Sequence, residues 1–371
     1  MKKIILSIAV LMAATVTLTS CDDDDDDNNP LNPDPIETLV LDGVYVINEG
    51  SYYSQINGSL DFLAYNGETE TYTMNRNIFD AANGRSLGGT PNHGALFGDS
   101  ILCIAVHEEN RVEFVNTKTK KAYEPVTISQ PREIAVSNEL GCIFVTSYAG
   151  KVSKIDMSTR SVITESEQIK GNLEGIAFSG NNLYVCTGWN SDYTYNNEVV
   201  MLKASTMEQI ATKTVIENPT QVIATNRGLF VLSMGNYGDV KATVQCMKNG
   251  EITEIGNATM MAYNATNEKL YMINAPYGAA PEYKVYDAAN GTTATFLTQP
   301  DIFLPYAIAT NDFTGEVYIT SLSESTDYPG SASYTTDGTI YRYSDKGILT
   351  GSYPCGVCPG TIVCGAHIEN K

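Results

Sequence analysis

Side chains that could do chemistry are few in this chain of 371 residues. It has three histidines, His93, His107 and His367, which excludes a histidine-rich metal centre. The G-x-S-x-G turn of hydrolases, the H-E-x-x-H motif of zinc proteases and the glycine-rich phosphate loop of nucleotide-binding enzymes do not occur in it. We therefore expect no catalytic residues, no metal ion and no cofactor, and the chain is predicted not to be an enzyme.

Near the C-terminus, Cys355 and Cys358 form a C-x-x-C pair, which is the spacing of redox and zinc sites. A zinc site would need a second pair of ligands, and a thioredoxin-like motif should open a helix in a βαβ unit, so neither is well supported. A structural disulfide is the third alternative, since an exported protein permits one. Cysteines within apolar strand patterns are instead expected to be buried thiols: Cys103, Cys142, Cys186 and Cys246.

The elements that position the polar side chains repeat seven times. Each unit has a short segment, often opened by proline, then a turn and an apolar strand, as in 131–136 followed by 142–145. Successive units begin about 40 to 54 residues apart, as four-stranded propeller blades do. Short runs of Val, Ile, Tyr and Phe between Gly, Asn and Asp exclude a helical solenoid. The sequence predicts an all-β seven-bladed β-propeller that spans residues 39–371.

The seventh unit is split between the two ends of the chain. The segment 359–364 has no strand after it, and the strand 44–47 has no such segment before it. We expect the two halves to pair in one blade, which would close the ring and remove an exposed sheet edge.

Aromatic residues concentrate in the loops that should connect the second and third strands of each blade. In a propeller these loops rise on one face around the central channel. Tyr and Trp combine an apolar ring with a polar tip and contact a ligand at low entropic cost. The alternative is that they pack against neighbouring blades. The expected ligand-binding aromatics are Tyr52, Tyr53, Tyr148, Trp189, Tyr193, Tyr195, Tyr237 and Tyr277.

Polar residues open the segments that should form the innermost strands. Amide, guanidinium, carboxylate and phenol groups at a channel mouth suit a large, flat ligand with a polar rim. Hydrogen bonds between blades are the alternative role for Glu133 and Gln221. Glu174 is the one carboxylate expected in the channel, and a single carboxylate is a poor site for a divalent cation. The expected binding residues here are Asn92, His93, Arg132, Glu174, Gln221 and Tyr306.

The N-terminus has the pattern of an exported lipoprotein. Two lysines, an apolar run and small residues before Cys21 predict a signal peptide at 1–20 and lipidation of Cys21, with an ordinary cleaved signal as the alternative. Asp22–Asp27 and three prolines then predict a solvated tether over 21–38. The net charge of −20, without a basic stripe, makes nucleic acid an improbable partner.

Two segments carry a family resemblance: 44–51, Val-Tyr-Val-Ile-Asn-Glu-Gly-Ser, and 57–62, Asn-Gly-Ser-Leu-Asp-Phe. They resemble the opening of YncE-like propeller lipoproteins of gut Bacteroidetes. With the signal, acidic tether and seven blades, the chain is similar to the BtuG-type surface cobalamin-binding lipoproteins. The acidic run likewise resembles the surface-export signal of Bacteroidetes lipoproteins, which implies display outside the outer membrane, whereas a merely soluble spacer is the alternative.

The resemblance implies a receptor without catalytic activity that captures cobalamin and other corrinoids and passes them to a BtuB-type TonB-dependent outer-membrane transporter. One motif departs from cobalamin enzymes: in D-x-H-x-x-G, Pro91 stands where Asp should precede His93, so a protein histidine is not expected to replace the lower ligand. A surface glycan-binding or adhesion module and a lactonase-like hydrolase with a calcium ion are the alternatives.

Overall fold

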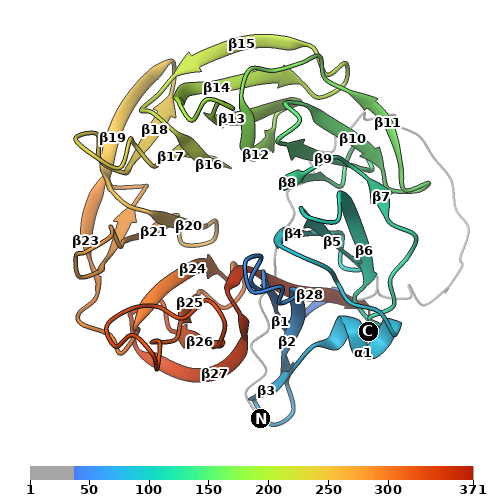
Figure 1. The fold of residues 1–371 in the computed structure, drawn as a ribbon, viewed down its shortest axis with the longest axis vertical. Coiled ribbons are helices and arrows are strands. Elements are labelled where there is room, and N and C mark those ends of the chain that lie inside the picture. Colours follow the sequence, from blue (N-terminus) through green and yellow to red (C-terminus); the bar gives the residue numbers. More distant parts are fainter. Residues whose placement is uncertain (1–36, 371) are drawn as a thin grey trace, which may run out of the picture.

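The computed structural model describes residues 37–370, with the backbone alone at 37–39 and 368–370, as a ring of seven four-stranded antiparallel sheets (Figure 1). This confirms the predicted all-β seven-bladed β-propeller. The expected signal peptide, Cys21 and the tether up to residue 36 lie outside the described residues. Residues 37 and 38 belong to the first strand.

We number the blades around the ring and give the strands of each from the centre outward. Blade 1 contains β28 (Pro359–Asn370), β1 (Glu37–Asn48), β2 (Ser59–Asn66) and β3 (Thr71–Asn75). Blade 2 contains β4 (Pro91–Phe97), β5 (Ile101–Val106), β6 (Arg111–Asn116) and β7 (Val126–Thr127). Blade 3 contains β8 (Pro131–Ser137), β9 (Cys142–Ser147), β10 (Val152–Asp156) and β11 (Ser161–Glu165). Blade 4 contains β12 (Asn172–Ser179), β13 (Asn182–Trp189), β14 (Tyr195–Lys203) and β15 (Gln209–Thr214).

The remaining blades follow the same order. Blade 5 contains β16 (Pro219–Thr225), β17 (Gly228–Ser233), β18 (Thr243–Lys248) and β19 (Glu251–Asn257). Blade 6 contains β20 (Met260–Asn264), β21 (Lys269–Asn274), β22 (Glu282–Asp287) and β23 (Thr292–Leu297). Blade 7 contains β24 (Leu304–Thr310), β25 (Val317–Leu322), β26 (Asp337–Tyr343) and β27 (Leu349–Val357). Within residues 37–370 there is one helix, α1 (Ile78–Asn83), between β3 and β4.

The hydrophobic core lies between neighbouring blades. All six residues of β9 are buried, because a blade covers each of its faces. Phe144 of β9 packs with Leu183 of β13 and Val200 of β14 in one such layer. The outermost strand of the same blade, β11, is mostly exposed. Apolar character therefore marks the middle strands of each unit, which is why the repeat is visible in the sequence.

Blade 1 joins the two ends of the chain. β1 pairs antiparallel with β28, with Val44 opposite Cys364 and Ile47 opposite Thr361. The expected split blade is therefore confirmed. Backbone hydrogen bonds between β1 and β28 close the ring. β28 is therefore the innermost strand of a complete four-stranded blade.

The ring has two distinct faces. The innermost strands all begin at one face, which we call the front face, and end at the other, the back face. Because the strands alternate in direction, the loops between the second and third strands of every blade also lie on the front face. β1 begins and β28 ends on the back face.

Candidate functional site

The front face carries large aromatic side chains that are exposed in the part of the chain that the structure describes. Tyr53 is 95 % exposed, Tyr193 is 78 % exposed and Tyr237 is 72 % exposed. The other exposed tyrosines of the front face are Tyr52, Tyr195, Tyr277, Tyr328 and Tyr334. Contributions come from blades 1, 4, 5, 6 and 7. Exposed apolar groups gathered on one face are typical of a surface that binds a ligand or partner.

A β-bulge in the innermost strand repeats around the ring. In blades 2, 5 and 7 the pairing register skips the residue after the proline, between Pro91 and His93, Pro219 and Gln221, and Pro305 and Ala307. It breaks over two residues in blades 3 and 4. A bulge leaves a residue outside the ladder and changes the direction of its side chain. Five polar residues near the beginning of the innermost strands lie in these bulges: Asn92, Arg132, Glu174, Thr220 and Tyr306.

Arg132, Tyr148 and Glu174 form the centre of the site. Arg132 Nε donates to Glu174 Oε2 at 3.1 Å, and the Tyr148 hydroxyl donates to Glu174 Oε1 at 2.5 Å. The guanidinium carbon lies 4.6 Å from the centroid of the Tyr148 ring, within cation–π distance. Burial opposes the charge of Arg132, but Glu174 and Tyr148 outweigh it and raise the pKa of Arg132. The buried Glu174 carboxylate is thus fully partnered.

A row of rings extends from this centre across blades 2, 3 and 4. The His107 and Tyr148 rings meet edge to face at 5.2 Å, and the Tyr148 and Trp189 rings do so at 5.5 Å. Tyr193 then stacks on Trp189, with the centroids 5.8 Å apart and the planes 9° apart. Such geometries are the favoured ones for aromatic pairs. Tyr148 and Trp189 are therefore fixed by their neighbours, whereas Tyr193 presents an exposed ring.

A second aromatic pair continues the surface from blade 4 to blade 5. Tyr195 and Tyr237 lie 6.1 Å apart between ring centroids. On blade 1, Tyr52 and Tyr53 meet edge to face at 5.3 Å. Tyr277, in blade 6, is exposed and makes no ring contact with another aromatic residue of 37–370.

Asn92 and His93 link blades 2 and 3 at the channel. Asn92 Nδ2 donates to the backbone oxygen of Arg132, and the Ile134 backbone N–H donates to His93 Nδ1 at 3.2 Å. Burial, with the nearby Arg132 charge, lowers the pKa of His93 to about 4. His93 is therefore neutral at pH 7 and accepts through Nδ1. Asn92 Oδ1 is buried and has no hydrogen-bond partner among residues 37–370.

Glu49 is a site residue that the sequence did not single out. It lies in the loop after β1, and Tyr306 donates its hydroxyl hydrogen to Glu49 Oε2 at 2.7 Å. Burial raises the pKa of Glu49, while Tyr306 and the Arg132 charge lower it. The Asn48-Glu49-Gly50 sequence is typical of a turn, and its position in the same kind of loop as the tyrosines was the signal that could have identified it.

Glu174 is not the only carboxylate that interacts with Arg132. Glu133 interacts electrostatically with both Glu174 and Arg132, and Glu49 interacts with Arg132. Burial, and then the Glu174 charge, raise the pKa of Glu133 to about 7. Arg132 is thus a cation that interacts with Glu49, Glu133 and Glu174.

A hollow of about 430 Å³ lies on the front face between blades 1 and 2. Tyr52, Tyr53, Glu108 and Glu109 are among its lining residues. Its volume is at the lower end of the range for ligand pockets. Gln221, in contrast, lies in β16 opposite Leu232, where it packs beside Gly175 of blade 4. The hydrogen bonds between blades expected as the alternative role are seen for Glu133, which accepts from the Ile176 backbone of blade 4, and not for the Gln221 side chain within residues 37–370.

The cysteines of the described chain are all free thiols. Cys103, Cys142, Cys186 and Cys246 are buried, as expected, and Cys355 and Cys358 do not form a disulfide. Burial raises the pKa of Cys358 to about 11. Among residues 37–370, no group of three His, Cys, Asp or Glu side chains is arranged to hold a metal ion. None of the helical structure in that range has the length and apolarity that a membrane span requires.

Comparisons with known proteins identify the fold. No protein-family model matches the chain, and no curated protein matches it in sequence. A quinoprotein alcohol dehydrogenase-like protein from Bacteroides thetaiotaomicron superposes with a TM-score of 0.62 at 14 % identity, over 88 % of this chain and 79 % of its own. A putative 6-phosphogluconolactonase from Bacteroides uniformis superposes with a TM-score of 0.61 at 12 % identity, over 86 % of this chain and 99 % of its own.

A third similar structure is a hypothetical selenium-binding protein from Sulfolobus tokodaii, with a TM-score of 0.61 and 11 % identity over 89 % of this chain and 93 % of its own. At such low identity these similarities show the shared propeller fold alone. Proteins with this fold host many unrelated functions, so function must be argued from the site.

Proposed function

We propose that this propeller is a receptor without catalytic activity that binds cobalamin and other corrinoids on its front face. The observation that carries the proposal is the set of exposed front-face tyrosines around the hydrogen-bonded group of Arg132, Tyr148 and Glu174. A preorganised, largely aromatic surface gives high affinity because little side-chain freedom is lost on binding.

The chemistry of the surface matches that of a corrinoid. A corrin is broad and flat, so it can cover several exposed rings at once. Its rim carries amide side chains, which donate hydrogen bonds to carboxylates and accept them from phenols. Glu49 supplies a carboxylate, of which only Oε2 has a hydrogen-bond partner among the described residues, the Tyr306 hydroxyl. Arg132 is already paired with Glu174, so a ligand phosphate would have to compete with that carboxylate.

We further propose that the protein is lipid-anchored through Cys21 to the outer membrane, faces the cell exterior, and delivers its ligand to a BtuB-type TonB-dependent transporter. This part of the proposal rests on the N-terminal sequence pattern and the family resemblance. The place where β1 begins supports it. β1 begins on the back face, so the chain enters the ring on the side opposite the aromatic surface.

Isothermal titration of residues 22–371 with cyanocobalamin tests the binding proposal. This chain lacks the lipidation site and keeps β1 whole. We expect tight binding of one ligand per protein. Absence of heat, together with absence of displacement at about micromolar concentrations, which corresponds to roughly −8 kcal/mol, would overturn the proposal.

Glycan binding is the second candidate function, and the exposed ring faces favour it. Tyr193 is stacked flat on Trp189 and leaves an aromatic face open, which is the kind of platform on which sugar rings pack. The same protein titrated with soluble polysaccharides would distinguish the two candidates. Binding of a polysaccharide with no response to cyanocobalamin would favour the glycan-binding function.

A further inference from the structure

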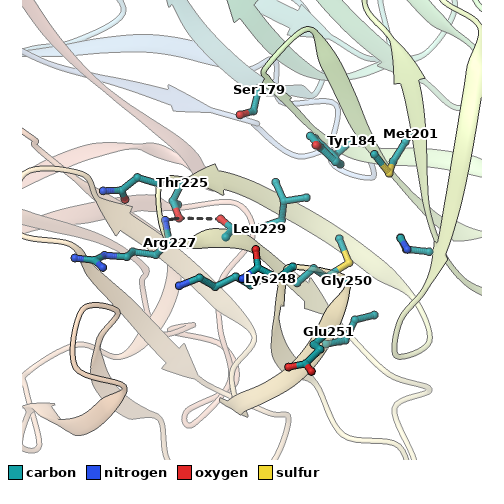
Figure 2. Close-up of a pocket in the computed structure, with 15 residues that line it drawn as sticks. Ser179, Tyr184, Met201, Thr225, Arg227, Leu229, Lys248, Gly250 and Glu251 are labelled. Atoms are coloured by element: carbon teal, nitrogen blue, oxygen red, sulfur yellow. Dashed lines mark hydrogen bonds between the residues drawn. The ribbon is translucent and has the colours of Figure 1, made fainter.

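A second hollow lies on the back face, on the opposite side of the ring from the aromatic surface. It has a volume of about 390 Å³ and lies between blades 4 and 5. Figure 2 shows Tyr184 and Met201 on one side of it and Arg227, Lys248 and Glu251 on the other. The proposed corrinoid receptor makes no use of this hollow, so its role is a separate question.

Basic side chains border the hollow, although the whole chain is strongly acidic. Lys213, Arg227 and Lys248 all line it. Arg227 is neutralised by Glu268, which accepts from its Nε at 3.0 Å and from its Nη2 at 2.5 Å. Neither Lys213 nor Lys248 belongs to an ion pair of residues 37–370.

Glu251, the one carboxylate of the lining, does not cancel the positive charge. It lies opposite Lys248 in the β18–β19 hairpin but forms no ion pair with it. Two lysines against one carboxylate leave a local excess of positive charge. A site of this kind attracts an anion in a protein whose overall field repels anions, so the attraction must be short-range.

Apolar side chains from both blades also line the hollow, together with a few uncharged polar ones. Tyr184 and Met201 come from blade 4, and Leu229, Met247 and Ile252 come from blade 5. Methionine side chains adapt to ligands of irregular shape, because they are unbranched and polarisable. A ligand that uses both parts of the hollow would need a negative head group and an apolar tail.

We propose that the back-face hollow binds an amphipathic anion, a carboxylate or phosphate attached to a single alkyl chain. Lys213 and Lys248 bind the head group, and Met201, Met247 and Leu229 contact the tail. The volume, at the lower end of the range for ligand pockets, suits one chain rather than two. This inference is independent of the proposed corrinoid binding.

Methyl NMR of residues 22–371 with labelled methionines tests the proposal in place. The probe is dodecanoate. Two comparison ligands each lack one part of it: butanoate has the charged head group but a short tail, and dodecanol has the long tail but no charge. We expect dodecanoate to shift the Met201 and Met247 signals and to leave those of Met74 and Met157, in blades 1 and 3, unchanged. Weaker binding of both comparison ligands is expected, since each lacks one half of the interaction.

Two double variants distinguish the effect of the two lysines in the hollow from the effect of the protein's net charge. Lys213→Gln with Lys248→Gln should weaken dodecanoate binding about tenfold or more, because both head-group partners are lost. Lys118→Gln with Lys346→Gln removes the same charge at exposed positions outside the hollow and should leave binding unchanged. Equal binding of dodecanol, equal loss in both variant pairs, or no shift at Met201 and Met247 would each overturn the proposal.

The same chemistry has two possible sources, a free fatty acid and a membrane lipid. Co-sedimentation with phosphatidylcholine vesicles that contain an anionic single-chain lysophospholipid distinguishes them. Vesicle binding that the Lys213→Gln and Lys248→Gln pair abolishes would identify a membrane lipid. Dodecanoate binding without vesicle binding would identify a free fatty acid.

Discussion

At the scale of single residues, the front face combines fixed and exposed side chains. Tyr148 is held by Glu174, Arg132 and two aromatic neighbours, so it acts as a rigid support. Trp189 lies between this support and the exposed Tyr193. Removal of Trp189 should therefore affect the ligand-contacting surface more than the fold.

Trp189→Ala is expected to weaken cyanocobalamin binding at least tenfold, because truncation of a binding hot spot costs about 2 kcal/mol or more. Titration calorimetry measures the affinity, and circular dichroism checks that the ring remains folded. Phe313→Ala is the control, since Phe313 is exposed in the back-face loop between β24 and β25. An unchanged affinity in a folded Trp189→Ala protein would remove this residue from the site.

Glu133 gives the site a pH dependence that can be measured. Burial and Glu174 raise the pKa of Glu133 to about 7. The folded state therefore holds this proton more tightly than the unfolded state. The resulting stability is fully present below the unfolded pKa and is lost as pH rises through about 7. His93 acts in the opposite sense, since its pKa is lowered to about 4 and stability is lost as pH falls toward that value.

The variant Glu133→Gln isolates the contribution of Glu133. Relative to the original protein, it should gain up to about 3 kcal/mol of unfolding free energy between pH 5 and pH 8, at about 1.4 kcal/mol per unit of pKa. Urea unfolding at both pH values measures this change. Glu139→Gln, at an exposed position of the same blade, should show none. A Glu133→Gln difference that does not grow with pH would contradict the assignment.

At the scale of elements, the innermost strands determine how closely the blades approach. Gly175 of β12 lies against β16, and an added Cβ would come 2.8 Å from Gln221 Cα and 2.8 Å from Thr220 O. Both of these are backbone atoms, which cannot rotate away as a side chain can. Glycine is therefore required here by packing between blades 4 and 5.

Gly175→Ala should lower the free energy of unfolding by about 1–3 kcal/mol, the usual cost of overpacking. Urea unfolding measures the loss. Gly67→Ala provides the matched control, because its added Cβ would find Tyr65 Cε1 at 3.8 Å as its nearest neighbour. Equal stability of the two variants would mean that β12 and β16 can separate without cost.

The elements also show what the sequence can and cannot predict. The buried middle strands carry an apolar pattern, so the seven blades and the split blade were predictable. The bulges at Arg132 and Glu174 depend on pairing with β9 and β13, and no local pattern encodes this. Glu49 was missed although its loop, between β1 and β2, also holds Tyr52 and Tyr53 and could have indicated it. The back-face hollow could not be predicted, since only the packing of blades 4 and 5 places Lys213 and Lys248 on the walls of one hollow.

At the scale of the whole molecule, the ring depends on the pairing of β1 with β28. A chain that ends at Cys358 lacks β28 and leaves one side of β1 without a partner. We expect this chain to aggregate, because an unpaired strand is a template for pairing with other copies. Size-exclusion chromatography detects the aggregates. A chain that begins at Glu37 keeps both strands and should behave as the original. Identical elution of the chain that ends at Cys358 would show that closure is dispensable.

The position of β1 also determines how the ring carries mechanical load. A pull on the chain at Glu37, directed away from the back face, acts along β1, which pairs with β28 on one side and β2 on the other. Such a pull shears both ladders at once, from Glu37 opposite Asn370 to Asn48 opposite Pro359. Many hydrogen bonds must then break together rather than one after another. A propeller held through its N-terminus can therefore resist drag without unravelling from its point of attachment.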